Sequence, residues 1–252
     1  MLTIENAGEA NAVNLGISRS NSEYCLIVNA DDPLMSGELF YEAAQILDSD
    51  KEIVAVYPDW QIISDSGEIV TIKITDDFSR ELLIGEFNCL PGPGAIFRTE
   101  IARLIHGRNP KLRFGSDYDF WLRLSLHGDF KRIPKVLAQW RSHEDSTSIN
   151  SKGLAMGKER IKIIEDFVDS VNLEQSLKRK ALAHAYYHAA LLSYFSSDIP
   201  GRKWMLKAIF IQRGWIKQSD LRIICFCLLY PLSRYLLPIV KKLPLINTVL
   251  KR

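Results

Sequence analysis

Short apolar runs alternate with amphipathic segments over the first part of the chain. Tyr24–Val28 and Ile53–Tyr57 are runs of the kind that form buried strands. Residues 7–18 and 36–48 instead repeat apolar side chains at helical spacing, which predicts two amphipathic helices. A strand followed by a helix and a second strand is typical of an α/β layer fold.

The pattern continues toward residue 141. Trp60–Ile63 and Ile69–Ile74 flank a Ser-Asp-Ser-Gly turn, which predicts a β-hairpin. A short helix is predicted at Thr99–Ile105 and a strand at Phe130–Trp140. Between them, Phe114–Leu126 predicts a helix that begins with a capping Ser116 and turns Phe120, Trp121 and Leu124 inward.

After residue 150 the periodicity is helical only. Lys158–Val171, Leu173–Phe195 and Arg202–Trp215 are amphipathic, so we expect one α/β domain over residues 1–150 and a helical region over residues 151–252. The last part, from residue 221, is apolar, basic and rich in proline. Charged side chains interrupt it too often for a bilayer-spanning helix. It is predicted either to lie in a membrane interface or to fold back as core helices.

Charge is divided unevenly along the 252 residues. The net charge is only +2, but the segment from residue 201 holds 11 Lys and Arg against one acid, Asp220. Such a basic tail suggests an anionic partner, and a peripheral contact of residues 201–252 with the inner face of the cell membrane is one expectation. The basic residues lie beside Ile, Leu and Phe, and no nucleic-acid module is recognisable, so no nucleic-acid partner is expected.

Cysteine usage and the N-terminus both favour a cytoplasmic protein. The four cysteines have no CxxC or zinc spacing, and three lie in apolar runs. Polar residues interrupt any apolar run near the N-terminus that could serve as a signal peptide.

Two adjacent acids, Asp31 and Asp32, follow the first predicted strand and precede Pro33. Ligands of open α/β sheets bind beyond the carboxyl ends of strands, and carboxylate oxygens suit Mg²⁺ or Mn²⁺. The alternative is an Asx-type turn in which the acids only accept hydrogen bonds from loop amides.

Two further acids, Asp117 and Asp119, fall in the first turn of a predicted helix. There the helix dipole favours negative charge, so a purely structural capping role is the alternative to a chemical one. A lone histidine beyond a strand, such as His143, is usually exposed or satisfied rather than a ligand. Gly153–Glu159 superficially suggests a P-loop, but its glycine spacing is short and Glu159 replaces Ser or Thr, which excludes that motif.

Residues 4 to about 148 resemble the family 2 (GT-A type) glycosyltransferases, which use nucleotide-sugars. Four segments carry the resemblance in the family's order: Gly8–Gly16, Asn29–Asp32, Gly92–Arg98, and Asp117–Arg123 with Trp140–His143. They look like the family's GxxDAxNxG helix, its DxDD metal motif, its PGxxxFR stretch and its DxDxWxR and YRxH pair. The resemblance implies an α/β fold with a GT-A (Rossmann-like) mixed sheet, flanking helices and an all-α C-terminal region.

The resemblance also implies roles. Asn11, Asp31 and Asp32 would bind the donor and its diphosphate, with Asp32 and His143 as ligands of Mn²⁺ or Mg²⁺. Asp117 would be the catalytic base. Gly94, Asp119 and Trp121 would lie on the acceptor side. The reaction would transfer a sugar, with inversion, from a nucleotide-diphosphate sugar to a saccharide or lipid-linked acceptor in cell-surface polysaccharide synthesis.

The chain departs from the family's pattern in three ways. Asn11 stands where the family usually has Asp, and Asn29 where the first acid of DxD often stands. The sequence also begins after the family's first strands, so an N-terminally truncated, incomplete sheet is expected. The alternative to a transferase is therefore a non-catalytic remnant or interaction module that keeps the fold without binding donor.

Overall fold

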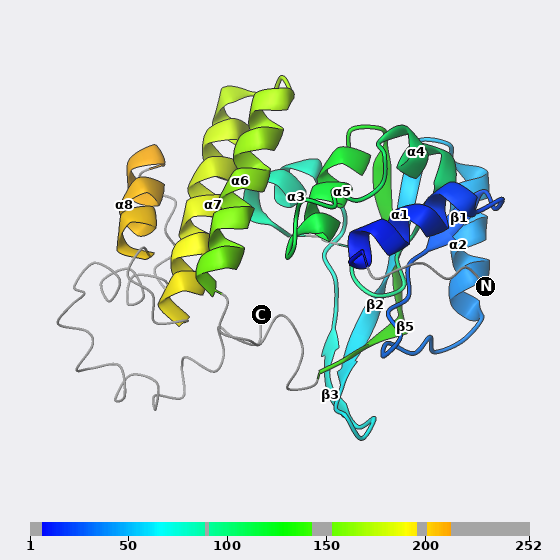
Figure 1. Ribbon diagram of the computed structural model, residues 1–252. Coiled ribbons are helices and arrows are strands. Elements are labelled where there is room, and N and C mark those ends of the chain that lie inside the picture. Colours follow the sequence, from blue (N-terminus) through cyan, green and yellow to red (C-terminus); the bar gives the residue numbers. More distant parts are fainter. Residues whose placement is uncertain (1–6, 89–90, 143–152, 196–200, 213–252) are drawn as a thin grey trace.

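The computed structural model describes residues 7–88, 91–142, 153–195 and 201–212, in which helices flank one mixed sheet (Figure 1). The helices are α1 (Glu9–Arg19), α2 (Glu38–Ser49), α3 (Arg80–Glu86), α4 (Thr99–Leu104), α5 (Ser116–Leu124), α6 (Gly153–Ser170), α7 (Gln175–Phe195) and α8 (Gly201–Ile211). The strands are β1 (Tyr24–Leu26), β2 (Ile53–Ile63), β3 (Ile69–Lys73), β4 (Ile96–Arg98) and β5 (Asp129–Arg141).

The sheet is organised around β2, whose apolar sequence is buried over most of its length. β5 pairs with β2 in parallel from Ile53 to Ile63, while β4 and β3 pair antiparallel with its first and second halves. The register of β2 against β5 shifts between Pro58 and Trp60. Proline has no amide hydrogen to donate to a neighbouring strand, so strands tolerate it where the pairing is irregular. Pro58 lies at such a place.

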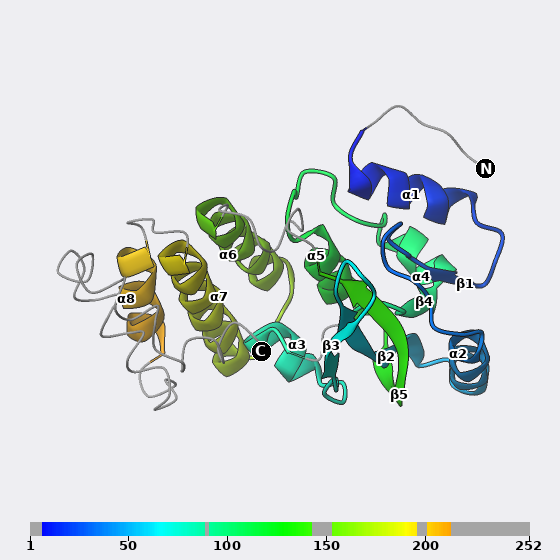
Figure 2. The same cartoon turned by 90° about the horizontal axis from the view of Figure 1, so that it is seen from below.

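β1 is an edge strand. Within the described residues it pairs with β4 alone, and all three of its residues are half-buried. In Figure 2 β1 lies between α1 and α2. The prediction of a fully buried strand at Tyr24–Val28 was therefore wrong, because an apolar run does not distinguish a central strand from an edge strand that helices partly cover.

One apolar core joins the sheet to the helical region. A chain of edge-to-face ring contacts, with centroids 4.9 to 6.0 Å apart, joins Phe97, Phe120, Trp121 and Phe130. The same buried cluster includes apolar residues of α6 and α7: Ile163, Ile164, Phe167, Val168, Ala181 and Ala185. The boundary predicted at residue 150 lies outside the described residues, and the core is continuous across it.

Most of the predicted elements are confirmed, with corrections. The hairpin, the short helix that begins at Thr99 and the inward face of α5 are present as expected. Helix α3 was not predicted. It begins after Ser79, whose side chain accepts a hydrogen bond from the Leu82 amide. Ser116 is the first helical residue of α5 and makes no capping hydrogen bond, so its predicted capping role was wrong.

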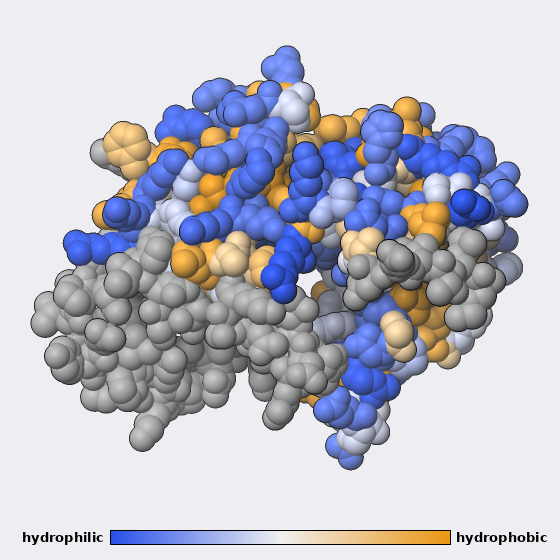
Figure 3. All heavy atoms as spheres, viewed as in Figure 1, coloured by the Kyte–Doolittle hydropathy of each residue, from blue (hydrophilic) through white to orange (hydrophobic). Residues whose placement is uncertain are grey.

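The helical region also has a second small core, in which Tyr187, Ala190 and Met205 pack between α7 and α8. Figure 3 shows a mainly hydrophilic face over the α/β region and over α6 and α7, with hydrophobic residues between the polar ones. Among the described helices, none is long and apolar enough to cross a membrane. Residues 213–252, which make up most of the predicted basic tail, lie outside the described residues.

Candidate functional site

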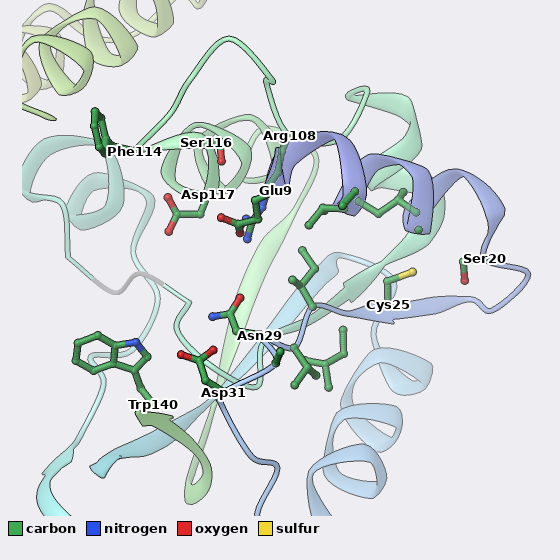
Figure 4. Close-up of a pocket in the computed structure, with 18 of the residues that line it drawn as sticks. Glu9, Ser20, Cys25, Asn29, Asp31, Arg108, Phe114, Ser116, Asp117 and Trp140 are labelled. Atoms are coloured by element: carbon green, nitrogen blue, oxygen red, sulfur yellow. The ribbon is translucent and has the colours of Figure 1, made fainter. Parts of the chain in front are cut away.

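A wide cavity of about 1080 Å³ opens between α1, β1 with its following loop, and the start of α5 (Figure 4). We call it the outer cavity. A smaller cavity of about 210 Å³, the inner cavity, extends toward β5 and the loop before β4. Six residues line both: Ile27, Val28, Asn29, Arg108, Asp117 and Trp140. The two cavities therefore share one wall and form a single candidate site.

The two adjacent acids after β1 have different surroundings. Asp31 is exposed and lines the outer cavity. Asp32 is only 7% exposed and lines the inner cavity. Its Oδ1 accepts a hydrogen bond from the Arg141 amide at 2.8 Å and its Oδ2 accepts one from Asn29 Nδ2 at 2.8 Å. Asp32 thus holds the acid-bearing loop against β5, while Asp31 lines the outer cavity.

Asp117 lies on the opposite wall, in the first turn of α5. It is exposed, lines both cavities and accepts a hydrogen bond from the Tyr118 amide at 2.7 Å. Figure 4 shows its carboxylate across the cavity from Asn29 and Asp31. The structure therefore brings Asp31 and Asp117 together around one space, although 86 positions separate them in the sequence.

A residue from the helical region holds the segment that leads into α5. The carboxylate of Glu159 in α6 accepts hydrogen bonds from the backbone amides of Arg113, Phe114 and Gly115, at 2.8, 2.6 and 2.7 Å. These bonds hold the backbone of the three residues that precede α5. They also position Asp117, since it follows this segment directly.

The positively charged side chain of Arg160, in α6, lies close to α5. The guanidinium of Arg160 stands 3.4 Å above the Phe87 ring, which in turn packs edge-on against Tyr118. Burial lowers the pKa of Arg160 to about 10, partly offset by the charges of Tyr118 and Asp117. Arg160 therefore remains positively charged at neutral pH.

The residues predicted for the acceptor side separate into two groups. Gly94 lines the inner cavity with φ +80°, and a Cβ there would lie 2.7 Å from the Ala138 Cβ. Trp121 also lines it but belongs mainly to the aromatic core. Asp119 instead lines a separate cavity and binds Arg123, with 2.6 Å between Oδ2 and Nη2. Arg123 in turn donates to the Gly107 carbonyl at 2.7 Å, so Asp119 supports the loop after α4.

One other predicted residue does not line the described site. Asn11 is exposed on α1, is not among the lining residues of either cavity, and donates to the Ala7 carbonyl at 2.7 Å. His143 lies outside the described residues, so its predicted metal role stays a prediction.

The carboxylate oxygens of this site suit a divalent ion that the protein coordinates only in part. Within the described part of the chain no group of three or more His, Cys, Asp or Glu side chains could hold a metal by itself. Mg²⁺ is commonly held by one or two carboxylates together with substrate phosphates and water, and Asp31 with Asp32 offers that number. A cation would therefore depend on the substrate for part of its coordination.

Sequence reasoning missed Arg108. It lies in the loop after α4, outside any motif, yet it is only 8% exposed and lines both cavities. The only signal in the sequence is the turn-forming glycine before it, Gly107.

Two curated relatives have similar sequences. Hyaluronan synthase of Pasteurella multocida is 27% identical over 183 residues, which is 72% of this chain and 18% of that protein. Chondroitin synthase of Pasteurella multocida (strain Pm70) is 28% identical over 147 residues, 58% of this chain and 15% of that protein. This chain is related to glycosyltransferases. It spans less than a fifth of the length of either relative. No protein-family profile matches it.

Solved structures agree on the fold. S. aureus TarS, residues 1–349, superposes with a TM-score of 0.60 at 14% identity, over 90% of this chain and 68% of that fragment. The same fragment in complex with UDP-GlcNAc gives a TM-score of 0.55 at 16% identity, over 85% of this chain and 58% of the fragment. The predicted fold class, a GT-A-like mixed sheet with flanking helices, is confirmed.

Proposed function

We propose that this chain transfers a sugar from a nucleotide-diphosphate sugar to an acceptor hydroxyl. The observation that carries the proposal is the pair of carboxylates, Asp31 and Asp117, on opposite walls of one open cavity. The relation to glycosyltransferases supports it independently.

Asp117 is proposed as the general base. Its exposed carboxylate at the start of α5 can accept a proton from an acceptor hydroxyl in the cavity. Attack by that hydroxyl on the anomeric carbon, from the side opposite the departing diphosphate, would invert the anomeric centre. No covalent sugar–enzyme intermediate is needed.

Asp31, Asp32 and His143 are proposed to hold Mn²⁺ or Mg²⁺. When bound, the cation would neutralise charge that builds on the leaving diphosphate. Asp31 is the side chain best exposed for this role. Asp32 would contribute mainly by fixing the loop, since both of its oxygens accept hydrogen bonds within the protein.

The substrates are proposed from the relatives. TarS has been crystallised with UDP-GlcNAc, which favours a UDP-sugar donor. The names of the two curated relatives favour a saccharide acceptor and a role in polysaccharide synthesis. A lipid-linked acceptor and a peripheral membrane contact through residues 201–252 complete the proposal.

Donor turnover tests the proposal. The full chain is incubated with UDP- and GDP-sugars, Mn²⁺ and oligosaccharide acceptors, and released nucleoside diphosphate is measured. Release that depends on both the metal and an acceptor is expected. Absence of release with every donor would instead favour the non-catalytic remnant.

A further inference from the structure

The loop that carries Arg108 is held in one conformation by Asn14 of α1. Asn14 Oδ1 accepts a hydrogen bond from the Arg108 amide, and Asn14 Nδ2 donates one to the Arg108 carbonyl, both at 2.7 Å. Gly107 has φ +65°, and a Cβ there would overlap the Asn14 side chain. The backbone at Arg108 is therefore fixed before any ligand arrives.

The guanidinium of Arg108 has unused hydrogen-bonding capacity. Its side chain is 9% exposed and its Nη1 forms an ion pair with Glu9. Its Nε is buried without a hydrogen-bond partner, one of two such side-chain atoms in the described part of the chain. A buried donor left unpaired costs free energy, so an arginine in this state favours an anion that can satisfy it.

The partner of Arg108 is itself replaceable. The side chain of Glu9 is 66% exposed, so this carboxylate can leave Arg108 for water at little cost. Figure 4 shows Glu9 and Arg108 beside Asp117 and facing the space above Asn29 and Asp31. An anion bound near Asp31 would lie within the same cavity as the guanidinium.

The charges of the outer cavity favour an anion that arrives with a cation. Its lining holds three carboxylates, on Glu9, Asp31 and Asp117, and two guanidinium groups, on Arg108 and Arg113. A free anion would meet repulsion from the acids, whereas a metal–diphosphate complex offers positive charge to the acids and phosphate oxygens to the arginine.

We propose that Arg108 binds diphosphate oxygens of the nucleotide, and that Glu9 occupies its guanidinium when no ligand is present. The identity of the anion rests on the proposed function; the presence of an anion-binding arginine does not. Arg108 is then a binding residue on the wall opposite Asp31, and Glu9 is an internal competitor for it.

Calorimetric titration of the full chain with inorganic pyrophosphate, in the presence of Mg²⁺, tests the proposal. Arg108→Gln is expected to weaken binding about tenfold or more, which corresponds to about 1.4 kcal/mol. Glu9→Gln is expected to tighten it severalfold, because the competing charge is removed. Arg113→Gln is the matched control, since it removes the same charge from an exposed position in the same cavity. It is expected to change binding by much less than Arg108→Gln.

The opposite effects of the two substitutions separate a binding role from a structural one. If Arg108 only ties the loop to α1, Glu9→Gln lowers the unfolding midpoint and leaves pyrophosphate affinity unchanged or weaker, which overturns the proposal. Equal losses in Arg108→Gln and Arg113→Gln would also overturn it, since they indicate general charge attraction. Should Arg108→Gln fail to fold, the Glu9→Gln titration still decides.

The result is distinct from that of the donor assay. If pyrophosphate binding depends on Arg108 but no nucleotide-sugar is turned over, the role of Arg108 is supported and the proposed transferase activity is excluded. If Arg108→Gln leaves turnover unchanged, only the proposed role of Arg108 is excluded.

Discussion

The Glu159 carboxylate in α6 accepts a hydrogen bond from the Gly115 amide at 2.7 Å, across 44 positions of sequence. With the bonds from the two preceding amides, it joins the helical region to the segment that leads into α5. A residue outside the predicted α/β domain therefore sets the position of the proposed base, Asp117.

Glu159→Ala is expected to lower the free energy of unfolding by about 2 kcal/mol, because it leaves backbone amides without their charged acceptor. Urea denaturation measures the loss, and hydrogen exchange should accelerate at residues 113–115. Asp166→Ala is the matched control on the same helix. Its exposed ion pair with Lys162 predicts little change in either measurement. Equal effects of the two substitutions would contradict the role of Glu159 in holding this segment.

Asp59 is expected to make stability depend on pH. Burial raises the pKa of its carboxyl, but hydrogen bonds from Arg132 and Thr75 outweigh burial and hold the pKa below its ordinary value of 3.8. A carboxyl with a depressed folded pKa stabilises the protein above its unfolded pKa. That contribution is lost as the pH falls through the folded value.

Asp59→Asn should therefore lower the free energy of unfolding by about 3 kcal/mol at neutral pH. It should also reduce the loss of stability that the wild type shows below about pH 4. Urea midpoints measured between pH 7 and pH 3 check both effects. Asp77→Asn is the control, since Asp77 lies 3.7 Å from the same Arg132 but is 90% exposed. If the urea midpoint of Asp59→Asn falls below pH 4 as steeply as that of the wild type, Asp59 is not the source of the pH dependence.

Gly94→Ala is expected to destabilise the protein by about 3 kcal/mol, since it adds an overlap with the Ala138 side chain to the cost of a positive φ. Gly67 has a similar φ of +86° but no atom within 4 Å of a Cβ. Gly67→Ala should thus cost only about 1 kcal/mol. Thermal unfolding compares the two. If Gly94→Ala destabilises the protein no more than Gly67→Ala does, close packing at the inner cavity is unimportant for stability.

Asp117→Asn should lower the turnover of the proposed reaction by about 10² to 10⁴, with donor affinity nearly unchanged, because only proton transfer is lost. Initial rates and donor titration together measure the two effects. Asp119→Asn, in the same helical turn, is expected to lower stability through Arg123 but to keep turnover per folded molecule. Parallel losses of turnover and affinity in Asp117→Asn would indicate a structural role.

Local patterns in the sequence predict much of this fold. The inward stripe of Phe120, Trp121 and Leu124 and the hairpin after Ile63 follow from periodicity and turn chemistry, and the structure confirms both. The acids after β1 were found because a strand end, a carboxylate pair and a proline occur together within a few residues.

Other features depend on contacts between distant segments, which no local pattern encodes. Ser116 is of a residue type that often caps helices, but it makes no capping hydrogen bond, and Glu159 of α6 holds the segment before the helix. Arg108 lies in a plain loop, and only the fold brings Asn14 and Glu9 to it. The edge position of β1 likewise depends on pairing, which its apolar sequence does not specify.

Metal-dependent nucleotide binding tests the central claim most directly. UDP is titrated calorimetrically into the wild type and into Asp31→Ala, with Mn²⁺ and again with a chelator. Asp31 is the better position for this test, because Asp32 also holds the loop to β5. We predict binding by the wild type with Mn²⁺ only, and none by a folded Asp31→Ala variant. Absence of Mn²⁺-dependent binding by the wild type at millimolar UDP, or equal binding by Asp31→Ala, would contradict the account.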